Sequence, residues 1–150
     1  MRLALYEPDI PQNTGTLMRL CACLGVPLDI IEPCGFILSD KNLRRAGMDY
    51  IDQLDMTKHM NWEAFKTASA GKRLILMSTK ASGSFLDFAF QPDDILIAGR
   101  ESAGVPEEVH AACDARVLIP LQPGLRSLNV ALASGIILGE ALRQTKGYPS

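Results

Sequence analysis

Short apolar segments alternate with segments of helical spacing along most of the chain, and this alternation predicts an α/β fold. The apolar segments are short and contain few polar residues, which is typical of strands in a parallel sheet covered on both faces. We expect strands at Leu3–Tyr6, Leu28–Ile31, Tyr50–Leu54, Arg73–Ser78, Ile95–Ala98 and Val117–Ile119.

The intervening segments carry apolar residues at helical spacing and have recognisable start and stop signals. Asn13 or Thr14 could cap the first helix, Ser39 the second, and Gly71 could end the third. We expect helices at Gly15–Leu24, Asp40–Met48, Asn61–Ala70, Pro106–Ala112 and Ser127–Gln144. The pattern therefore predicts one α/β domain over residues 1–150, a mostly parallel sheet with helices on both faces.

Composition narrows the function classes. The chain has a hydrophobic content of 47%, a formal net charge of −2 and a sequence pI of about 5.6. A globular protein of this charge does not bind nucleic acid through bulk charge, although a local basic patch is compatible with it. The group Lys41, Arg44, Arg45 and Lys58 could be such a patch or simply a solvated face.

The N-terminal residues and the cysteines indicate a cellular compartment. The first residues lack a long apolar core and a cleavage site of the signal-peptide type, so we expect a cytoplasmic protein. The four cysteines, at positions 21, 23, 34 and 113, lack the paired spacing of a zinc site. We expect them to be free thiols in a reducing compartment, and we expect no metal.

Several common nucleotide and catalytic motifs are missing. The sequence has no G-x-G, which removes the dinucleotide fingerprint, and no G-x-S-x-G elbow. Gly99 and Gly104 have the spacing of a phosphate-binding loop, but Val105 and Pro106 stand where that loop requires Lys and Ser or Thr.

Three polar loops remain after these exclusions. Residues 8–15 follow the first strand and precede Arg19, residues 99–104 follow a buried strand, and residues 123–130 lead into the last helix. Taken singly, each has an ordinary structural interpretation: a capped loop with a surface Arg, a tight turn, and a helix N-cap at Ser127. Together they predict a ligand crevice at the carboxyl ends of the strands.

The three loops also carry a family resemblance that spans nearly the whole chain. It rests on residues 5–8, 10–11, 13–15, 19–22, 31–33, 35–36, 43–50, 78–80, Gly99, Glu101, Gly104, Pro106, 119–120, 126–129 and 147–149. These segments resemble the motifs of the SPOUT superfamily of RNA methyltransferases, in its TrmL/YibK-type branch of tRNA 2′-O-methyltransferases. The resemblance implies a SPOUT α/β knot with a C-terminal deep trefoil knot.

The same resemblance implies a cofactor and its contacts. Members of this superfamily bind S-adenosylmethionine, and no metal is implied. The matching cofactor positions are Met77, Gly99, Ile119 and Ser127, with Leu121 and Leu128 as pocket walls. Arg100, Gln122, Gly124 and Leu125 depart from the family pattern, and relatives often have Pro at the position of Arg100.

The resemblance further assigns catalytic roles. Arg19 matches an Arg that activates the ribose hydroxyl in relatives. Because a guanidinium stays protonated, we expect Arg19 to stabilise the developing alkoxide rather than to act as a base. Asn13 would position Arg19 or the ribose, Glu101 would orient Arg19 or another loop residue, and Asn129 would hold the third loop.

The substrate implied by the resemblance is the wobble nucleotide of leucine tRNAs, a cytidine or a modified uridine. The family is dimeric, so we expect a homodimer formed through the first and last helices. Lys41, Arg44, Arg45 and Lys58 become candidate phosphate contacts. The alternatives are a SPOUT enzyme for another tRNA site or for ribosomal RNA, and a knotted RNA-binding protein without catalysis.

Overall fold

The strands of the computed structural model, which describes residues 1–39, 41 and 51–150, form one parallel sheet. The strands are β1 (Arg2–Tyr6), β2 (Leu28–Ile31), β3 (Met56–His59), β4 (Leu74–Met77), β5 (Ile95–Ala98) and β6 (Ala115–Val117). Their order is β3-β2-β1-β5-β4-β6, and every pairing is parallel. The chain therefore changes direction across the sheet between β1 and β5, where loops at the carboxyl ends diverge.

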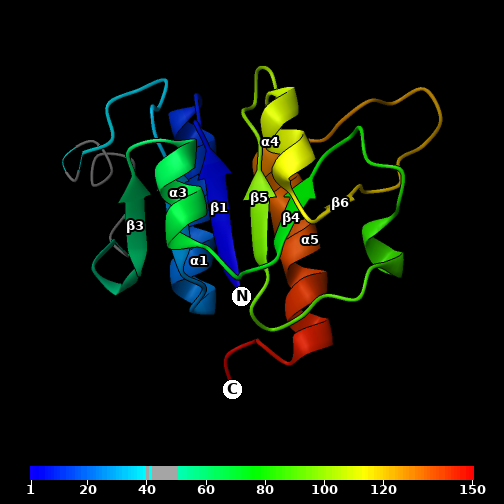
Figure 1. Ribbon diagram of the computed structural model, residues 1–150. Helices are drawn as coiled ribbons and strands as arrows, with labels where there is room; N and C mark the ends of the chain where they lie inside the picture. Colours follow the sequence, from blue (N-terminus) through cyan, green and yellow to red (C-terminus); the bar gives the residue numbers. More distant parts are fainter. Residues whose placement is uncertain (40, 42–50) are drawn as a thin grey trace.

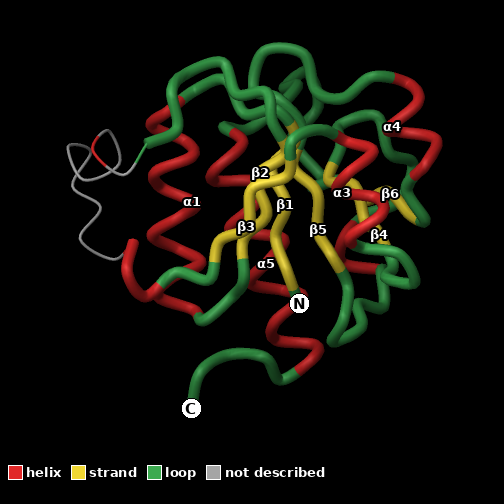
Figure 2. The backbone as a smooth tube through the Cα atoms, turned by 60° about the vertical axis from the view of Figure 1, so that its left-hand side comes forward, coloured by secondary structure: helices red, strands yellow, loops and turns green. Residues whose placement is uncertain are grey.

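Helices cover both faces of the sheet, as predicted (Figures 1 and 2). The helices are α1 (Pro11–Leu24), α3 (Trp62–Ala68), α4 (Glu107–Ala112) and α5 (Val130–Thr145), with short 3-10 turns at Ile51–Gln53 and Phe85–Asp87. Alternate residues of each strand face opposite layers: Leu3 and Leu5 pack with α1 and α5, whereas Ala4 and Tyr6 pack with α3 and α4. Both layers are consequently filled by apolar side chains, which explains why the central strands β4 and β5 are apolar throughout.

Several element boundaries differ from the prediction, most of them by one or two residues. The strand predicted at Tyr50–Leu54 is wrong: the strand is Met56–His59, an edge strand whose Thr57 and Lys58 are exposed. Such a strand lacks the apolar run used to find the others. The sixth strand is Ala115–Val117, so Ile119 follows it instead of ending it.

The first and last helices also begin elsewhere than expected. α1 starts at Pro11, so Asn13 and Thr14 lie inside the helix and do not cap it. Proline fits the first turn because its missing N–H is not needed there. α5 starts at Val130 with Asn129 as its N-cap, and Ser127 lies in the loop before it. The predicted helix Asp40–Met48 lies outside the described residues.

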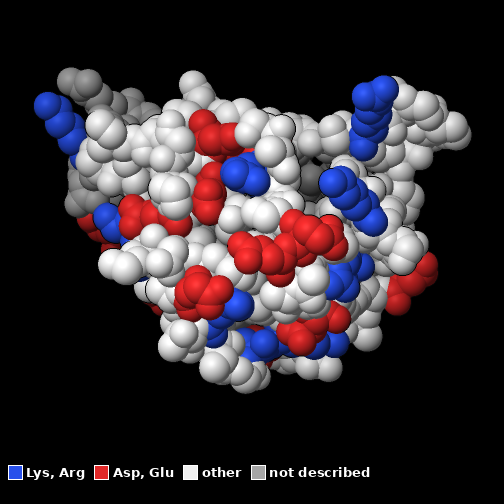
Figure 3. Space-filling model, turned by 45° about the horizontal axis from the view of Figure 1, so that its top comes forward, with Lys and Arg blue, Asp and Glu red and all other residues white. Residues whose placement is uncertain are grey.

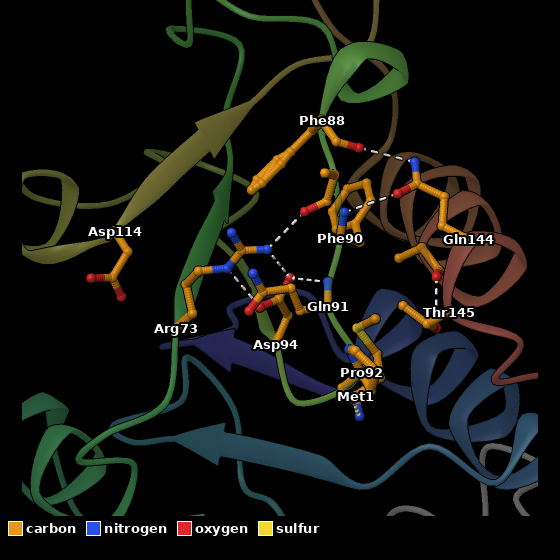
Figure 4. A network of polar contacts seen from close by, with 12 residues as sticks. Met1, Arg73, Phe88, Phe90, Gln91, Pro92, Asp94, Asp114, Gln144 and Thr145 are labelled. Carbon is orange, nitrogen blue, oxygen red and sulfur yellow. Dashed lines mark hydrogen bonds and ion pairs between the residues drawn. The ribbon is translucent and has the colours of Figure 1, made fainter.

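A polar network ties the loop between β4 and β5 to the end of α5 (Figure 4). The guanidinium of Arg73 donates to both oxygens of Asp94, at 2.8 and 2.7 Å, and Asp94 is 1% exposed. Gln144 donates to the carbonyl of Phe88 and accepts from the N–H of Phe90, each at 2.9 Å. The network fixes the C-terminal turn of α5 against residues 88–94.

Candidate functional site

A cavity of about 340 Å³ opens at the carboxyl ends of β4, β5 and β6. Its walls are the ends of these strands, the loops that follow them, and the first turns of α5. Acidic and basic side chains are mixed over this end of the molecule, which Figure 3 views obliquely, so no single sign of charge covers it. Ligand binding at this end therefore depends on individual side chains more than on a uniformly positive or negative electrostatic potential.

The loop after β5 is a tight hairpin that forms one wall of the cavity. Arg100 and Gly104 exchange two backbone hydrogen bonds of 2.9 Å. A Cβ on Gly99 would stand 2.9 Å from the carbonyl carbon of Gly104, and Gly104 has a φ of +63°. Both glycines are thus required by the turn itself, which holds backbone groups at the cavity edge.

The hairpin is joined to the loop after β1 by a reciprocal pair of hydrogen bonds. The N–H of Asp9 donates to Glu101 Oε2 at 3.1 Å, and the N–H of Glu101 donates to Asp9 Oδ1 at 3.2 Å. Ser102 Oγ also donates to Asp9. Glu101 therefore holds the first polar loop against the second.

The two carboxyl groups of this contact titrate differently. Burial, together with the hydrogen bond to Asp9, raises the pKa of Glu101. The hydrogen bonds from Glu101 and Ser102 lower the pKa of Asp9. The proton that this pair takes up on acidification accordingly resides on Glu101 first.

The third polar loop is joined to α1 through two asparagines. Asn129 Nδ2 donates to Asn13 Oδ1 at 3.0 Å, while Asn129 Oδ1 accepts from the N–H groups of Ala131 and Leu132. Asn129 thus caps α5 and holds it to the buried Asn13 at once. Asn129 therefore joins the third polar loop to α1.

Arg100 has partners that its sequence position did not predict. Its guanidinium lies 5.5 Å from the ring centre of Tyr6, and Nε donates to the carbonyl of Gly104 at 3.1 Å. Burial first, and then the neighbouring Glu7, raise the pKa of Tyr6 to about 12. Arg100 therefore packs its cation on a neutral phenol at the rim of the cavity.

The structure gathers the predicted cofactor residues at one place. The cavity is lined by all six of them: Met77, Gly99, Ile119, Leu121, Ser127 and Leu128. Glu101 lines it as well, whereas Asn13 and Asn129 stand beside it as the link between α1 and α5.

Arg19 occupies a different position from the other predicted catalytic residues. It is exposed on α1 and is not among the residues that line the cavity. Asn13 and Arg19 are six residues apart, which puts them about 120° apart around the helix. The side chain that Asn13 contacts here is Asn129.

The predicted basic patch is described only in part. Lys41 and Lys58 are exposed, and Lys58 lies on the edge strand β3. Arg44 and Arg45 lie outside the described residues. None of the described members of this patch lines the cavity.

Lys80 and His110 are among the polar residues of the cavity that were not predicted as site residues. Lys80 lines it from the loop that follows β4. A cation in a loop shortly after an apolar strand is a sequence signal that could have indicated it. His110 lines it from α4. An isolated histidine on a short helix gives no comparable sequence signal.

Two further observations concern ligands and membranes. Across residues 1–39, 41 and 51–150, no three or more His, Cys, Asp or Glu side chains are grouped so as to hold a metal ion. Over the same residues, none of the helices has the length and apolarity needed to cross a bilayer.

Comparison with known proteins gives consistent matches over nearly the full chain. Residues 1–139 match the model of the SpoU rRNA Methylase family. A protein of Beijerinckia indica subsp. indica named tRNA (cytidine(34)-2'-O)-methyltransferase is 63% identical over 144 residues, covering 95% of this chain and 90% of its own length.

Solved structures agree with these matches. One, described as "Structural insights into the 2-OH methylation of C/U34 on tRNA", is 42% identical with a TM-score of 0.90, covering 97% of this chain and 96% of the other. The SpoU methyltransferase AviRb from Streptomyces viridochromogenes, in complex with AdoMet, is 26% identical with a TM-score of 0.81, covering 96% of this chain and 60% of the other. The α/β fold class is thereby confirmed, and the chain belongs to the SpoU methylase family of SPOUT methyltransferases.

Proposed function

We propose that the protein is a tRNA (cytidine(34)-2'-O)-methyltransferase that uses S-adenosylmethionine to methylate the wobble ribose of leucine tRNAs, at cytidine or a modified uridine. The observation that carries the proposal is the single cavity lined by Met77, Gly99, Ile119, Leu121, Ser127 and Leu128. The relative that is 63% identical carries that activity in its name. The solved structure that is 42% identical concerns methylation of nucleotide 34 on tRNA.

The residues of the cavity suit the proposed cofactor. Leu121, Leu128 and Ile119 supply apolar walls for a flat heterocycle, and the absence of a side chain at Gly99 leaves backbone groups at the edge. S-adenosylmethionine supplies a methyl group on a positively charged sulfur, which is already activated for transfer. The acidic Glu101 at the cavity wall favours such a cation nearby.

The chain's own residues must then bind the ribose and deal with its proton. Methyl transfer would join the ribose 2′-oxygen to the methyl carbon while the sulfur–carbon bond breaks, with the electron pair staying on sulfur and the hydroxyl proton passing to water. As that proton leaves, negative charge would develop on the 2′-oxygen. Arg19 would stabilise this charge by donating from its guanidinium. Glu101 would hold the first loop in place through Asp9. Asn129 would hold the third loop in place through Asn13.

The role of Arg19 is tested by substitution with a matched control on the same helix. Thr16 is also exposed on α1, so Thr16→Ala reports on surface changes alone. We expect Arg19→Ala to lower kcat at least about 100-fold, within the range attributed to one electrostatic donor, while leaving S-adenosylhomocysteine binding unchanged. Wild-type turnover in Arg19→Ala would remove Arg19 from the mechanism.

We propose a homodimer formed through the exposed face of α5 and the adjoining α1. Leu132 and Ile136 are one helical turn apart on α5 and are 62% and 46% exposed. α5 packs against α1, where Leu20 lies 3.7 Å from the position of a Cβ on Gly135. Exposed apolar side chains at this spacing are typical of an interface.

The dimer is tested by the mass of the protein in solution. Leu132→Asp should shift it from twice the chain mass toward one chain mass in light scattering after size exclusion. Met60, which is 76% exposed at the end of β3, offers the control Met60→Asp. An unchanged mass in Leu132→Asp would place the interface elsewhere.

The proposal also covers the contacts with tRNA, the cellular location and the topology of the chain. Lys41, Arg44, Arg45 and Lys58 would contact tRNA phosphates, residues 1–150 would act as one domain, and the protein would work in the cytoplasm. A C-terminal trefoil knot is part of the proposal, because the chain has the fold of methyltransferases of this family.

The decisive experiment is nucleoside mass spectrometry of RNA incubated with protein and S-adenosylmethionine. Total tRNA should gain 2′-O-methylcytidine at position 34 of leucine tRNAs, and ribosomal RNA should gain none. Methylation at another tRNA site or in ribosomal RNA would refute the substrate. Binding of tRNA without any methylation would favour a non-catalytic RNA-binding protein.

A further inference from the structure

Arg100 stands at the rim of the cavity, and the family resemblance assigns it no role. It begins the hairpin that forms one wall, and it is half-buried and lines the cavity. Residues 102–104 of the same hairpin are exposed, and the hydrogen bond from Arg100 Nε to the carbonyl of Gly104 is itself exposed to solvent. The guanidinium is therefore accessible to a ligand that reaches the cavity from outside.

Two contacts hold the guanidinium in one orientation. Its carbon lies 5.5 Å from the centre of the Tyr6 ring, and Nε donates to the carbonyl of Gly104 at 3.1 Å. Tyr6 is fixed in turn, because it is 4% exposed and packs edge-on against Trp62, with the ring centres 6.0 Å apart. A ligand that binds to an ordered arginine loses less free energy in restricting its rotamers.

The two terminal nitrogens of this guanidinium remain available. Within the described part of the chain, Nη1 and Nη2 of Arg100 take part in no hydrogen bond or ion pair. Glu7 and Glu108, whose charges act on Tyr6, form no ion pair with Arg100 there. Glu101 instead accepts from the N–H of Asp9. Because Nη1 and Nη2 carry donors only, this end of the side chain suits an anion with two adjacent oxygens.

A phosphodiester suits these donors better than the carboxylate of the methyl donor does. Parallel N–H groups of a guanidinium can bind two oxygens of either anion at once. The methyl donor, however, also carries a sulfonium and an ammonium group, which a guanidinium repels. RNA has a phosphate on each side of the reacting ribose, and it must approach from the solvent side, where Arg100 is accessible.

We propose that Nη1 and Nη2 of Arg100 bind an RNA phosphate next to the ribose that is methylated. Arg100 makes the contact, and Tyr6 is a positioning residue that holds the guanidinium. The phosphate would anchor the RNA backbone at the opening while the 2′-hydroxyl enters the cavity. The proposal rests on the proposed function, since it concerns the RNA substrate of that same cavity.

Fluorescence anisotropy with an anticodon stem-loop RNA of a leucine tRNA, measured at several salt concentrations, tests the contact. Arg100→Met should raise Kd about 10-fold and reduce the slope of log K against log salt by about 0.7, the value for one phosphate of a single strand. Arg100→Lys keeps the charge but not the planar group, so it should restore the slope and only part of the affinity. Unchanged Kd and slope in Arg100→Met would overturn the proposal.

Lys72→Met is the matched control for the loss of one positive charge. Lys72 is 48% exposed and precedes β4, at the end of the strands opposite to the cavity. Its removal should leave the RNA affinity and the salt slope as in wild type. The same loss of slope in Lys72→Met and Arg100→Met would reduce the effect to net charge and refute a specific phosphate contact.

Neutral methylphosphonate linkages in the same RNA locate the phosphate. At one of the two linkages that flank nucleotide 34, the replacement should weaken binding to wild type about as much as Arg100→Met does. It should weaken binding to Arg100→Met no further, because the contact is already lost. Equal losses in both proteins at both linkages would show that Arg100 binds neither phosphate.

Calorimetry with S-adenosylhomocysteine separates this contact from the cofactor. Its Kd should be the same in Arg100→Met and wild type, which would also show that the hairpin is intact. A higher Kd in Arg100→Met would assign the side chain to the cofactor and overturn the proposal. A wild-type protein that binds neither the RNA nor S-adenosylhomocysteine would refute the proposed function, and this inference with it.

The role of Tyr6 is tested by removing and restoring its ring. Tyr6→Leu should raise the Kd for RNA about 2- to 5-fold, the effect of a lost cation–π contact, with S-adenosylhomocysteine binding unchanged. Tyr6→Phe should recover that loss because it keeps the face of the ring. Equal Kd values for RNA in Tyr6→Leu and Tyr6→Phe would show that Tyr6 does not position Arg100.

Discussion

Asp94 is a buried acid whose removal should destabilise the fold strongly. It is 1% exposed, and its two oxygens accept three hydrogen bonds: two from Arg73, at 2.8 and 2.7 Å, and one from the N–H of Gln91, at 2.8 Å. Asp94→Ala removes all three and leaves Arg73 with the carbonyl of Ala89 and the face of Phe88.

The magnitude follows from the burial of the two partners. Breaking a fully buried ion pair by removing one member costs about 3–5 kcal/mol. Because the Arg73 side chain is 31% exposed, water can solvate part of the cation that remains, and we expect about 2–4 kcal/mol. For a chain of this size that corresponds to a fall in Tm of roughly 4–16 °C.

The assay is urea unfolding followed by circular dichroism, at one protein concentration for all variants. Asp93→Ala is the matched control, because Asp93 is the adjacent acid, its side chain is 84% exposed, and its partner Lys72 is 4.0 Å away. The control should change the free energy of unfolding by less than about 0.5 kcal/mol. A comparable loss in Asp93→Ala and Asp94→Ala would show that the buried pair is not what stabilises this region. A cycle with Arg73→Ala then measures the coupling between the two side chains.

Three further predictions concern the cavity and its supports. Gly99→Ala should weaken S-adenosylhomocysteine binding at least about 10-fold in calorimetry, because its Cβ would stand 2.9 Å from backbone. Carbon NMR should find the pKa of Glu101 above its usual value and that of Asp9 below it; in Asp9→Asn the pKa of Glu101 should fall but stay raised by burial. The lowered pKa of Asp9 gives stability that is lost as the pH falls through that pKa, whereas the raised pKa of Glu101 gives stability that is lost as the pH rises through it. In Asp9→Asn, the free energy of unfolding should therefore fall less steeply as the solution is acidified. Gln144→Ala should lower the free energy of unfolding by about 1–3 kcal/mol, because the Phe90 N–H and the Phe88 carbonyl lose their partner.

The strands that could be predicted from the sequence are those buried on both faces. Ile95–Ala98 has the predicted bounds, because a fully apolar run has no alternative place in a folded chain. Leu28–Ile31 also has the predicted bounds, although it contains Asp29, whose buried carboxylate is partnered by Arg2 and His59. Met56–His59 could not be found in this way. It pairs with β2 on one side alone, and its Thr57 and Lys58 meet solvent, so its sequence carries no apolar period.

Helix starts were hard to predict because several residues in each loop could serve as caps. Ser127 and Asn129 are both good N-cap residues, and only the contact with Asn13 distinguishes them. That contact joins residues 116 positions apart, which local sequence cannot reveal. The same holds for Asp9 and Glu101, whose hydrogen bonds bring the first two polar loops together across β1 and β5.

The candidate site divides into a part that sequence motifs carry and a part that only tertiary contacts create. The six cofactor positions lie in or beside the motifs, and the structure places them around one cavity. His110 lines the same cavity without belonging to any motif, and its contact with Arg116 joins α4 to β6. A contact between side chains of two different elements is set by how those elements pack, so no local pattern in the sequence predicts it.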